Sequence, residues 1–288
     1  MGWHSYDEDA RSIRSANIGY TDITKPNSQI FKQRELHPLM DPKKFIVREC
    51  RDSELYPITI PIIIALDETG SMGHIPRDFI AEGLPTIMTT LKEAGISGAQ
   101  VCFVGVGDHK NDMGPLQVGQ FEAGDEQLDK WLSSIWLEGK GGGNGGESYH
   151  LVYFFAAHMT STDAFEKRNQ KGFLFTIGDE ACHSDLSREA IEQHIGHPVE
   201  KGYSFDELYK LAKARYNVYH LHIGDDFIAE RSWKDRLGEN LIKVSNYKDI
   251  PKLIVQVLLA NKVEVISTSQ SQSNIDDNVV DSEKLNLY

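Results

Sequence analysis

The chain has 288 residues, 40% of them hydrophobic and 25% charged, which is enough to bury a full core in one large domain. A formal net charge of −13 argues against a nucleic-acid-binding surface, because phosphate neutralisation needs clustered Lys and Arg. No apolar stretch approaches the roughly 20 residues of a membrane helix, and the first residues lack the apolar core of a signal peptide. Three widely spaced cysteines fit a reducing compartment better than a disulfide framework. We therefore expect a cytoplasmic protein with no nucleic-acid or membrane partner.

Composition divides the chain into three regions. Residues 1–42 are polar, show no sustained hydrophobic period and carry turn signals, which predicts an arm that lies on the domain or is partly ordered. Residues 43–262 contain the predicted strands and helices and form the expected domain. Residues 263–288 are polar and low in complexity, which predicts a flexible tail.

The domain is expected to begin with a short edge strand and then a central strand. Residues 44–50 alternate between apolar and polar side chains, as a half-exposed strand does. Residues 62–66 form an unbroken run that is mostly β-branched, which is typical of a parallel strand buried on both faces. A helix is predicted over 76–94, with Gly95 as its C-cap and Pro85 bending it.

Strands and helices continue to alternate along the rest of the domain. The predicted strands are 99–106, an antiparallel edge strand 115–121, 171–177, 217–223 and 241–244. The predicted helices are 125–137, 147–159, 187–194, 204–214, 227–237 and 250–259. This alternation predicts an α/β fold with a doubly wound, mostly parallel sheet and helices on both faces.

The first distinctive stretch follows the central strand directly. Asp67, Thr69 and Ser71 place a carboxylate and two hydroxyls at alternate positions in a loop. Open α/β sheets collect their ligands at the carboxyl ends of their strands, and oxygen donors suit a hard cation. The same oxygens accept Mg²⁺, Mn²⁺ or Ca²⁺. The alternative is that Ser71 only caps the helix that follows.

The second distinctive stretch, residues 139–150, is GKGGGNGGESYH. Such glycine density is typical of a backbone that turns sharply or approaches a ligand closely. A phosphate-binding loop is disfavoured because the stretch lacks the Gly-Lys-Ser/Thr ending and does not follow a strand. Glu147 is expected in the first turn of the next helix, and Asp179 follows the predicted strand 171–177.

Together these stretches resemble the metal-ion-dependent adhesion site (MIDAS) of von Willebrand factor A (vWA) domains, of the intracellular bacterial and phage type. The residues DETGS, 67–71, resemble the first motif, Asp-x-Ser/Thr-x-Ser. Residues 142–148 resemble the Gly-Gly-Gly-Asp-x-Pro-Glu-Ser variant of integrin β subunits and alpha-kinase-linked A domains, with Gly146 in place of Pro. Residues 176–183 resemble the third motif, Asp-Ala-Pro-x-His.

The resemblance implies a doubly wound fold with a divalent ion, Mg²⁺ or else Mn²⁺ or Ca²⁺, at the carboxyl ends of the strands. It implies that Thr69 and Ser71 coordinate the ion directly. Asp67, Glu147 and Asp179 would supply charge directly or through water. Without a cation these converging carboxylates should repel one another and have raised pKa values.

A second cation near Asp108 and Asn144 is implied by the resemblance to integrin β subunits. The alternative is that both side chains hydrogen-bond only to the backbone of their loops. Zinc at Asp108, His109, Asp112 and His183 is disfavoured, because their spacings match no zinc motif.

The expected function is a non-catalytic protein-interaction module that binds a partner's carboxylate through its metal ion. The chain shows the full ligand set but no nucleophile–base pair beside it. Intracellular members of the family often work beside AAA+ ATPases of the MoxR type, so the resemblance implies such a partner. The alternatives are a metal-dependent phosphohydrolase with Asp67 as nucleophile and a structural or assembly protein. The phosphohydrolase would need a second Asp where Thr69 stands.

Overall fold

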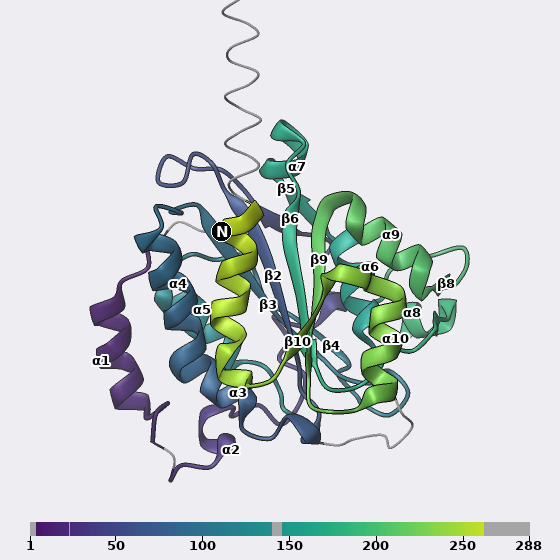
Figure 1. Ribbon diagram of the computed structural model, residues 1–288, viewed down its shortest axis with the longest axis horizontal. Helices are drawn as coiled ribbons and strands as arrows, with labels where there is room; N and C mark the ends of the chain where they lie inside the picture. The colour runs from purple at the N-terminus through teal and green to yellow at the C-terminus, as the bar shows by residue number, and fades with distance from the viewer. Residues whose placement is uncertain (1–3, 23, 140–145, 262–288) are drawn as a thin grey trace, which may run out of the picture.

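A six-stranded sheet forms the centre of the protein (Figure 1), and the computed structural model describes residues 4–22, 24–139 and 146–261. In chain order its strands are β2 (Ile60–Asp67), β3 (Ala99–Val106), β4 (Leu116–Val118), β6 (Gly172–Gly178), β9 (Tyr216–Ile223) and β10 (Leu241–Val244). Their spatial order is β10-β9-β6-β2-β3-β4, and only the β3–β4 pair is antiparallel. The predicted doubly wound α/β fold is confirmed, including the antiparallel edge strand.

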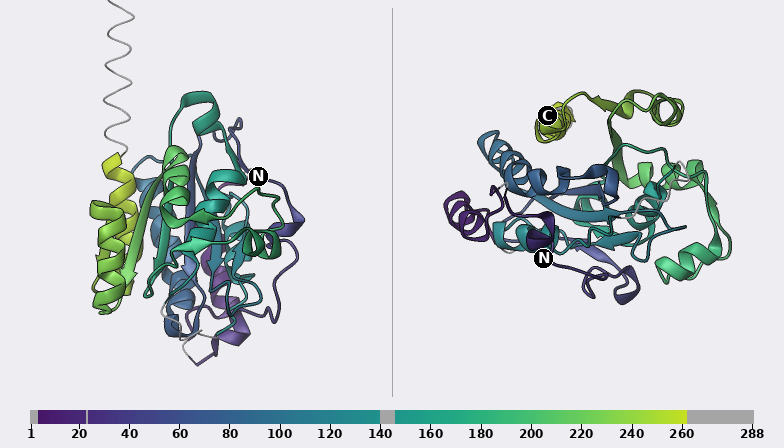
Figure 2. Two further views of the ribbon diagram at one scale, coloured as in Figure 1. Left: turned by 90° about the vertical axis from the view of Figure 1, so that its right-hand side faces the viewer. Right: turned by 90° about the horizontal axis from the view of Figure 1, so that it is seen from below.

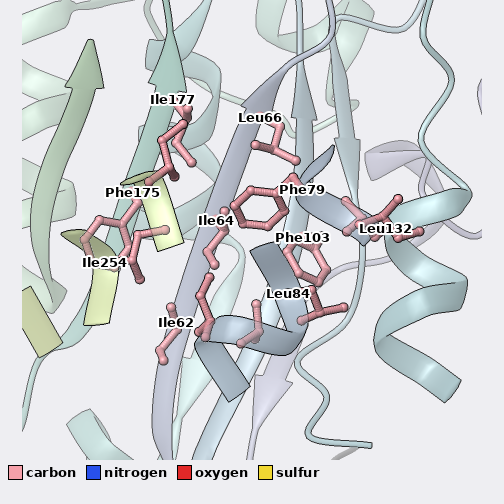
Figure 3. Packing of buried hydrophobic residues seen from close by; sticks show 14 of the residues in the cluster. Ile62, Ile64, Leu66, Phe79, Leu84, Phe103, Leu132, Phe175, Ile177 and Ile254 are labelled. Atoms are coloured by element: carbon pink, nitrogen blue, oxygen red, sulfur yellow. The ribbon is translucent and has the colours of Figure 1, made fainter. Parts of the chain in front are cut away.

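Strand β2 is buried on both faces because helices cover both sides of the sheet (Figure 2). Ile62, Ile64 and Leu66 belong to one hydrophobic cluster, whereas Ile63 and Ala65 belong to the other. Figure 3 shows the first cluster, in which aromatic and aliphatic side chains from β3, β6 and the covering helices pack against β2. Burying each large aliphatic side chain contributes about 1.5–3 kcal/mol, so β2 firmly anchors the loop that follows it.

The helix predicted over 76–94 is divided into three segments. These are α3 (Ile75–Asp78), the π-helical η3 (Phe79–Gly83) and α4 (Leu84–Glu93). Pro85 lies in the first turn of α4, where its missing N–H and its ring are tolerated; the wider turn of η3 precedes it. Gly95 adopts φ +73°, and it and the next residue donate backbone hydrogen bonds to the last turn of α4, which confirms the glycine helix end.

The remaining elements complete the two layers. The helices are α5 (Asp125–Ser133), α6 (Tyr149–His158), α7 (Asp163–Arg168), α8 (Arg188–His194), α9 (Phe205–Arg215), α10 (Phe227–Leu237) and a last helix over residues 250–261. The 3₁₀ turns are η1 (Pro42–Lys44), η2 (Gly70–Met72), η4 (Gly238–Asn240) and η5 (Tyr247–Asp249). A small antiparallel pair joins β7 (Asp185–Leu186) to β8 (Tyr203–Ser204). Within the described residues, no helix has both the length and the hydropathy needed to cross a membrane.

Several predicted bounds were wrong; the helix predicted over 125–137, for example, ends at Ser133. The segment predicted as an edge strand over 44–50 is only β1 (Arg48–Cys50), which pairs in parallel with β5 (Thr160–Thr162) outside the main sheet. Glu147 does not lie in the first turn of α6, because its backbone N–H donates to Ala181 instead. The helix begins two residues later, and Glu147 forms a bridge between two loops.

The N-terminal segment contains two helices that its polar sequence did not predict, α1 (Glu8–Ile18) and α2 (Asn27–Ile30). Figure 1 shows α1 at the outer edge of the helices beside the sheet. It is held there by charge: Arg11 and Asp129 form a buried ion pair at 2.9 Å, and Arg14 contacts Asp125 at 2.7 Å. Tyr20, Ile30, Phe31 and Met40 then join the main hydrophobic cluster.

Candidate metal centre

The candidate site lies at the point where the chain changes direction across the sheet. From β2 the chain continues to β3 on one side, and it later returns to place β6 on the other side. The loops after β2 and β6 therefore face each other at the carboxyl ends of neighbouring parallel strands. Ligands of open α/β sheets bind at such a switch point.

Asp67 is the last residue of β2 and is fully buried. Its Oδ1 accepts hydrogen bonds from the backbone N–H of Thr69 at 2.8 Å and from Thr69 Oγ1 at 2.6 Å. Tyr149 OH, from α6, donates to Asp67 Oδ2 at 2.7 Å. Burial raises the pKa of Asp67 to about 6, although these three hydrogen bonds oppose the shift.

The chain of oxygen contacts continues from Thr69 to the third motif. Thr69 Oγ1 lies 3.1 Å from Ser71 Oγ, and Ser71 Oγ donates to Asp179 Oδ1 at 3.1 Å. Ser71 therefore does not act as the predicted alternative, a cap for the helix that follows. Helix α3 has His74 at its N-cap, and no side chain caps it. The structure brings four of the predicted site residues together: Asp67, Thr69, Ser71 and Asp179.

Glu147 lies between the loops after β3 and β6. It is 4% exposed, its N–H donates to Ala181 O at 2.8 Å and its C=O accepts from the His183 N–H at 3.1 Å. Burial raises the pKa of Glu147 to about 9, and the negative charge of Asp67 makes the next-largest contribution to this shift. Among the described residues, no hydrogen-bond partner reaches Glu147 Oε2. A buried carboxyl in this setting is either protonated or neutralised by a cation.

Asn144 lies outside the described residues, so its predicted role in a second cation site stays a prediction. Asp108, the other residue of that site, is buried in the loop after β3. Its Oδ1 accepts from the Lys110 backbone N–H at 3.1 Å and from His183 Nε2 at 2.9 Å. The backbone contact agrees with the turn alternative, and the His183 contact goes beyond it.

Glu68 is a further site carboxylate to which the sequence analysis gave no role. It is 2% exposed, and Gln117 Nε2 donates to its Oε2. Burial raises its pKa well above the usual value, and Glu138 and Asp112 add to the shift. Glu68 continues the ladder of β2, because its N–H donates to Val106 O at 3.0 Å. The one signal in the sequence was its position directly after Asp67 at the end of the apolar run.

Gly107 is needed where these carboxylates meet. A Cβ at this position would lie 2.5 Å from Asp112 Oδ2 and 3.1 Å from Glu68 Oε1. Any other residue at this position would force the two acidic side chains apart.

Two histidines and one cysteine lie in the loops beside the site. Zinc at Asp108, His109, Asp112 and His183 was disfavoured because of their spacing along the chain, but the structure brings ligand atoms of Asp108, His109 and His183 within 4.8 Å of one another. Burial, and then His183, lowers the pKa of His109 to about 4. Cys182 is buried in the second hydrophobic cluster, and burial raises its pKa to about 12. It therefore packs as a thiol in the core.

No protein-family model and no curated protein matches the chain. Among solved structures, the chain is similar to the pilus adhesin SpaC from Lactobacillus rhamnosus GG in its open conformation. The identity is 13% and the TM-score 0.45, over 75% of this chain and 30% of that one. It is also similar to proximal thread matrix protein 1 from the mussel byssus, at 12% identity and a TM-score of 0.43, over 69% and 46% of the two chains. A form of that protein described as having a zinc-occupied MIDAS motif gives 12% identity and a TM-score of 0.42, over 69% and 47%. The chain thus spans less than half the length of each of these structures, and similarity of this degree does not extend to function.

Proposed function

We propose that this chain is a vWA-like, non-catalytic module that binds a partner protein through a divalent metal ion. One observation carries the proposal: an unbroken series of oxygen contacts runs from Asp67 through Thr69 and Ser71 to Asp179 at the switch point of the sheet. The series joins two loops that are distant in sequence, because Ser71 and Asp179 are 108 residues apart.

The spacing of these oxygens fits a small hard cation. Octahedral ligands about 2.1 Å from Mg²⁺ lie about 3.0 Å from one another. The Thr69–Ser71 and Ser71–Asp179 oxygen pairs are each 3.1 Å apart. Thr69, Ser71 and Asp179 would hold the ion, while Asp67 orients Thr69 and Glu147 adds negative charge. Mg²⁺ is therefore the first ion to test, followed by Mn²⁺ and Ca²⁺.

The site is open on the side of Ser71 and Asp179. Ser71 is exposed and Asp179 is half-buried, whereas Asp67 and Thr69 are buried beneath them. A bound ion would supply positive charge and a coordination position that a partner's carboxylate can fill. A partner offering Asp or Glu is favoured because a neutral surface would leave that position to water.

The environment of Asp67 supports a non-catalytic role. A phosphoryl-accepting carboxylate must present a free oxygen to its substrate. Asp67 is fully buried, and both of its oxygens already accept hydrogen bonds. This arrangement disfavours the alternative of a phosphohydrolase with Asp67 as nucleophile.

The proposal extends to the identity of the partner and to the cellular compartment. The family resemblance makes a MoxR-type AAA+ ATPase or its client the first candidate partner. A cytoplasmic location is supported by Cys50, Cys102 and Cys182, which are all buried free thiols.

The proposal is tested by titrating the full-length, metal-free protein with Mg²⁺ and Mn²⁺ in a calorimeter. Ser71→Ala and Asp179→Asn should each weaken ion binding by at least about tenfold, and the control Ser133→Ala, on α5, should not. Capture of a purified MoxR-type ATPase by wild type should then be lost with chelator. Ion binding that is equal in wild type and both site variants would overturn the proposal.

A further inference from the structure

Two histidines and one aspartate lie close together beside the oxygen site, and none of the three belongs to the series of oxygen contacts described above. Asp108 and His109 follow β3, and His183 follows β6. The backbone of residues 146–148 joins these loops: Ser148 N–H donates to Gly107 O at 3.1 Å, and Glu147 bonds to Ala181 and His183. These main-chain bonds hold the three side chains in place without any contribution from a metal.

The distances between their polar atoms suit a tetrahedral ion. Asp108 Oδ1 lies 2.9 Å from His183 Nε2 and 4.0 Å from His109 Nδ1, and the three ligand atoms are all within 4.8 Å of one another. Two ligands of a tetrahedral zinc ion with bonds of about 2.0–2.1 Å lie about 3.3 Å apart. Small side-chain rotations therefore suffice to place an ion between the three.

We propose that Asp108, His109 and His183 form a binding site for a borderline transition-metal ion such as Zn²⁺. Imidazole nitrogens favour zinc and its neighbours, whereas Mg²⁺ and Ca²⁺ favour oxygen alone. Two His and one carboxylate leave a fourth position open, as in catalytic rather than structural zinc sites. The site therefore differs in ion preference from the oxygen site, and it does not depend on the proposed function.

The fourth position is accessible from solvent. His109 and His183 line an open cavity of about 610 Å³, whose other wall includes Tyr203 and Glu207. Ser148 Oγ lies 2.6 Å from His109 Nδ1 and 3.5 Å from Asp108 Oδ1. Either this hydroxyl or a water from the cavity can complete the coordination.

A proton and Lys110 compete with the metal. Lys110 Nζ lies 3.2 Å from His183 Nδ1 and can only donate to it, so His183 Nε2 carries a proton and donates to Asp108. When a metal binds His183 Nε2, the ring proton moves to Nδ1, which can then no longer accept from the Lys110 ammonium. The exposed Lys110 side chain must therefore turn toward solvent. Lys110→Gln should therefore tighten metal binding severalfold, whereas a purely structural His183–Asp108 contact predicts no gain.

The test uses the full-length, metal-free protein in millimolar Mg²⁺, which occupies the oxygen site. Co²⁺ is the visible probe, and Zn²⁺ is the competitor that displaces it. We expect one Co²⁺ with the absorption of a four-coordinate ion, and at least about tenfold weaker binding in His109→Ala and His183→Ala. The control is His197→Ala, because the ring of His197 packs against Phe154 and His158 on α6, whereas the histidine rings that pack against His109 are His150, His183 and His194.

Two further arms separate this inference from the proposed function. Ser71→Ala should lose Mg²⁺ and keep Co²⁺; Co²⁺ lost from Ser71→Ala but retained by His183→Ala would overturn the inference. The second arm is nitrogen NMR of the histidine rings in the wild-type protein, which does not depend on the folding of any variant. Zn²⁺ should shift the ring nitrogens of His109 and His183, and a response confined to other histidines would also overturn it.

Discussion

The two candidate ion sites lie at the same edge of the sheet but are assembled differently. In the oxygen site, Asp67, Thr69 and Ser71 come from five consecutive positions at the end of β2, and Asp179 joins them from a distant loop. In the nitrogen-containing site, Asp108 and His183 are 75 residues apart, and backbone bonds through Glu147 bring them together. A local motif reveals its chemistry in the sequence, whereas a site built by loop packing reveals it only in three dimensions.

The largest expected effect is on the stability of the fold. It tests whether ion binding at the two sites is independent of the packing of helix α1. Arg11→Ala removes one partner of a buried ion pair and leaves Asp129 with only its contact to Arg14. The free energy of unfolding, measured by urea denaturation, should fall by about 3 kcal/mol, the low end for a broken buried pair, because Arg14 still contacts Asp129. Mg²⁺ and Zn²⁺ affinities at temperatures where the variant is folded should not change. A change in either would mean that α1 couples to the rim of the sheet.

Asp67→Ala should separate the two sites most clearly. It removes the carboxylate that orients Thr69, so Mg²⁺ affinity should fall about 100-fold, equivalent to about 2.7 kcal/mol. Zn²⁺ affinity should stay within about threefold of wild type, since every proposed zinc ligand is retained. Calorimetric titration with each ion measures both, and circular dichroism checks the fold. An equal loss of both ions would show that the sites are one.

The change of melting temperature with pH should show whether Glu147 and Glu68 are buried carboxyl groups that no cation neutralises. The pKa of Glu147 is raised to about 9 and that of Glu68 is raised as well, so the folded state holds these protons more tightly than the unfolded chain does. Their contribution is fully present below the unfolded pKa, near 4.5, and is lost as pH rises toward about 9. Burial lowers the pKa values of several histidines, including His109 and His150, and these are neutral in both states above about pH 7.5. The melting temperature of the chelator-treated protein should therefore fall between about pH 7.5 and pH 9.

Mg²⁺ should restore more stability at the higher pH, where more carboxylates are ionised. Glu147→Gln should flatten the profile, and Glu189→Gln, an exposed change on α8, should not. A melting temperature that rises between about pH 7.5 and pH 9 in chelator would contradict the assignment of Glu147 as a buried carboxyl with a raised pKa.

The smallest expected effect is that of Tyr149→Phe. It removes the hydroxyl that donates to Asp67 Oδ2 and leaves the ring in its buried position. Losing one hydrogen bond to a carboxylate should weaken Mg²⁺ binding by about 1 kcal/mol and leave Zn²⁺ binding unchanged. Titration of both ions against the wild type measures this difference. An unchanged Mg²⁺ affinity would mean that Asp67 acts only through Thr69.

The sequence by itself determined the features that depend on neighbouring residues. The apolar run of β2 predicted a central buried strand, because only a doubly covered strand tolerates side chains that are apolar on both faces. Asp67, Thr69 and Ser71 were identified because they follow that strand directly. Asp179 was found in the same way, at the end of β6.

Only the tertiary structure decided what distant segments contribute. Helix α1 lacked an apolar stripe because Arg11 and Arg14 hold it through ion pairs to α5, and such pairs leave no period in the sequence. Glu147 was expected in a helix, but its N–H bonds to a neighbouring loop. His109 and His183 meet only because that loop packing brings two strand ends together. Contacts of this kind depend on chain paths that local residue patterns do not encode.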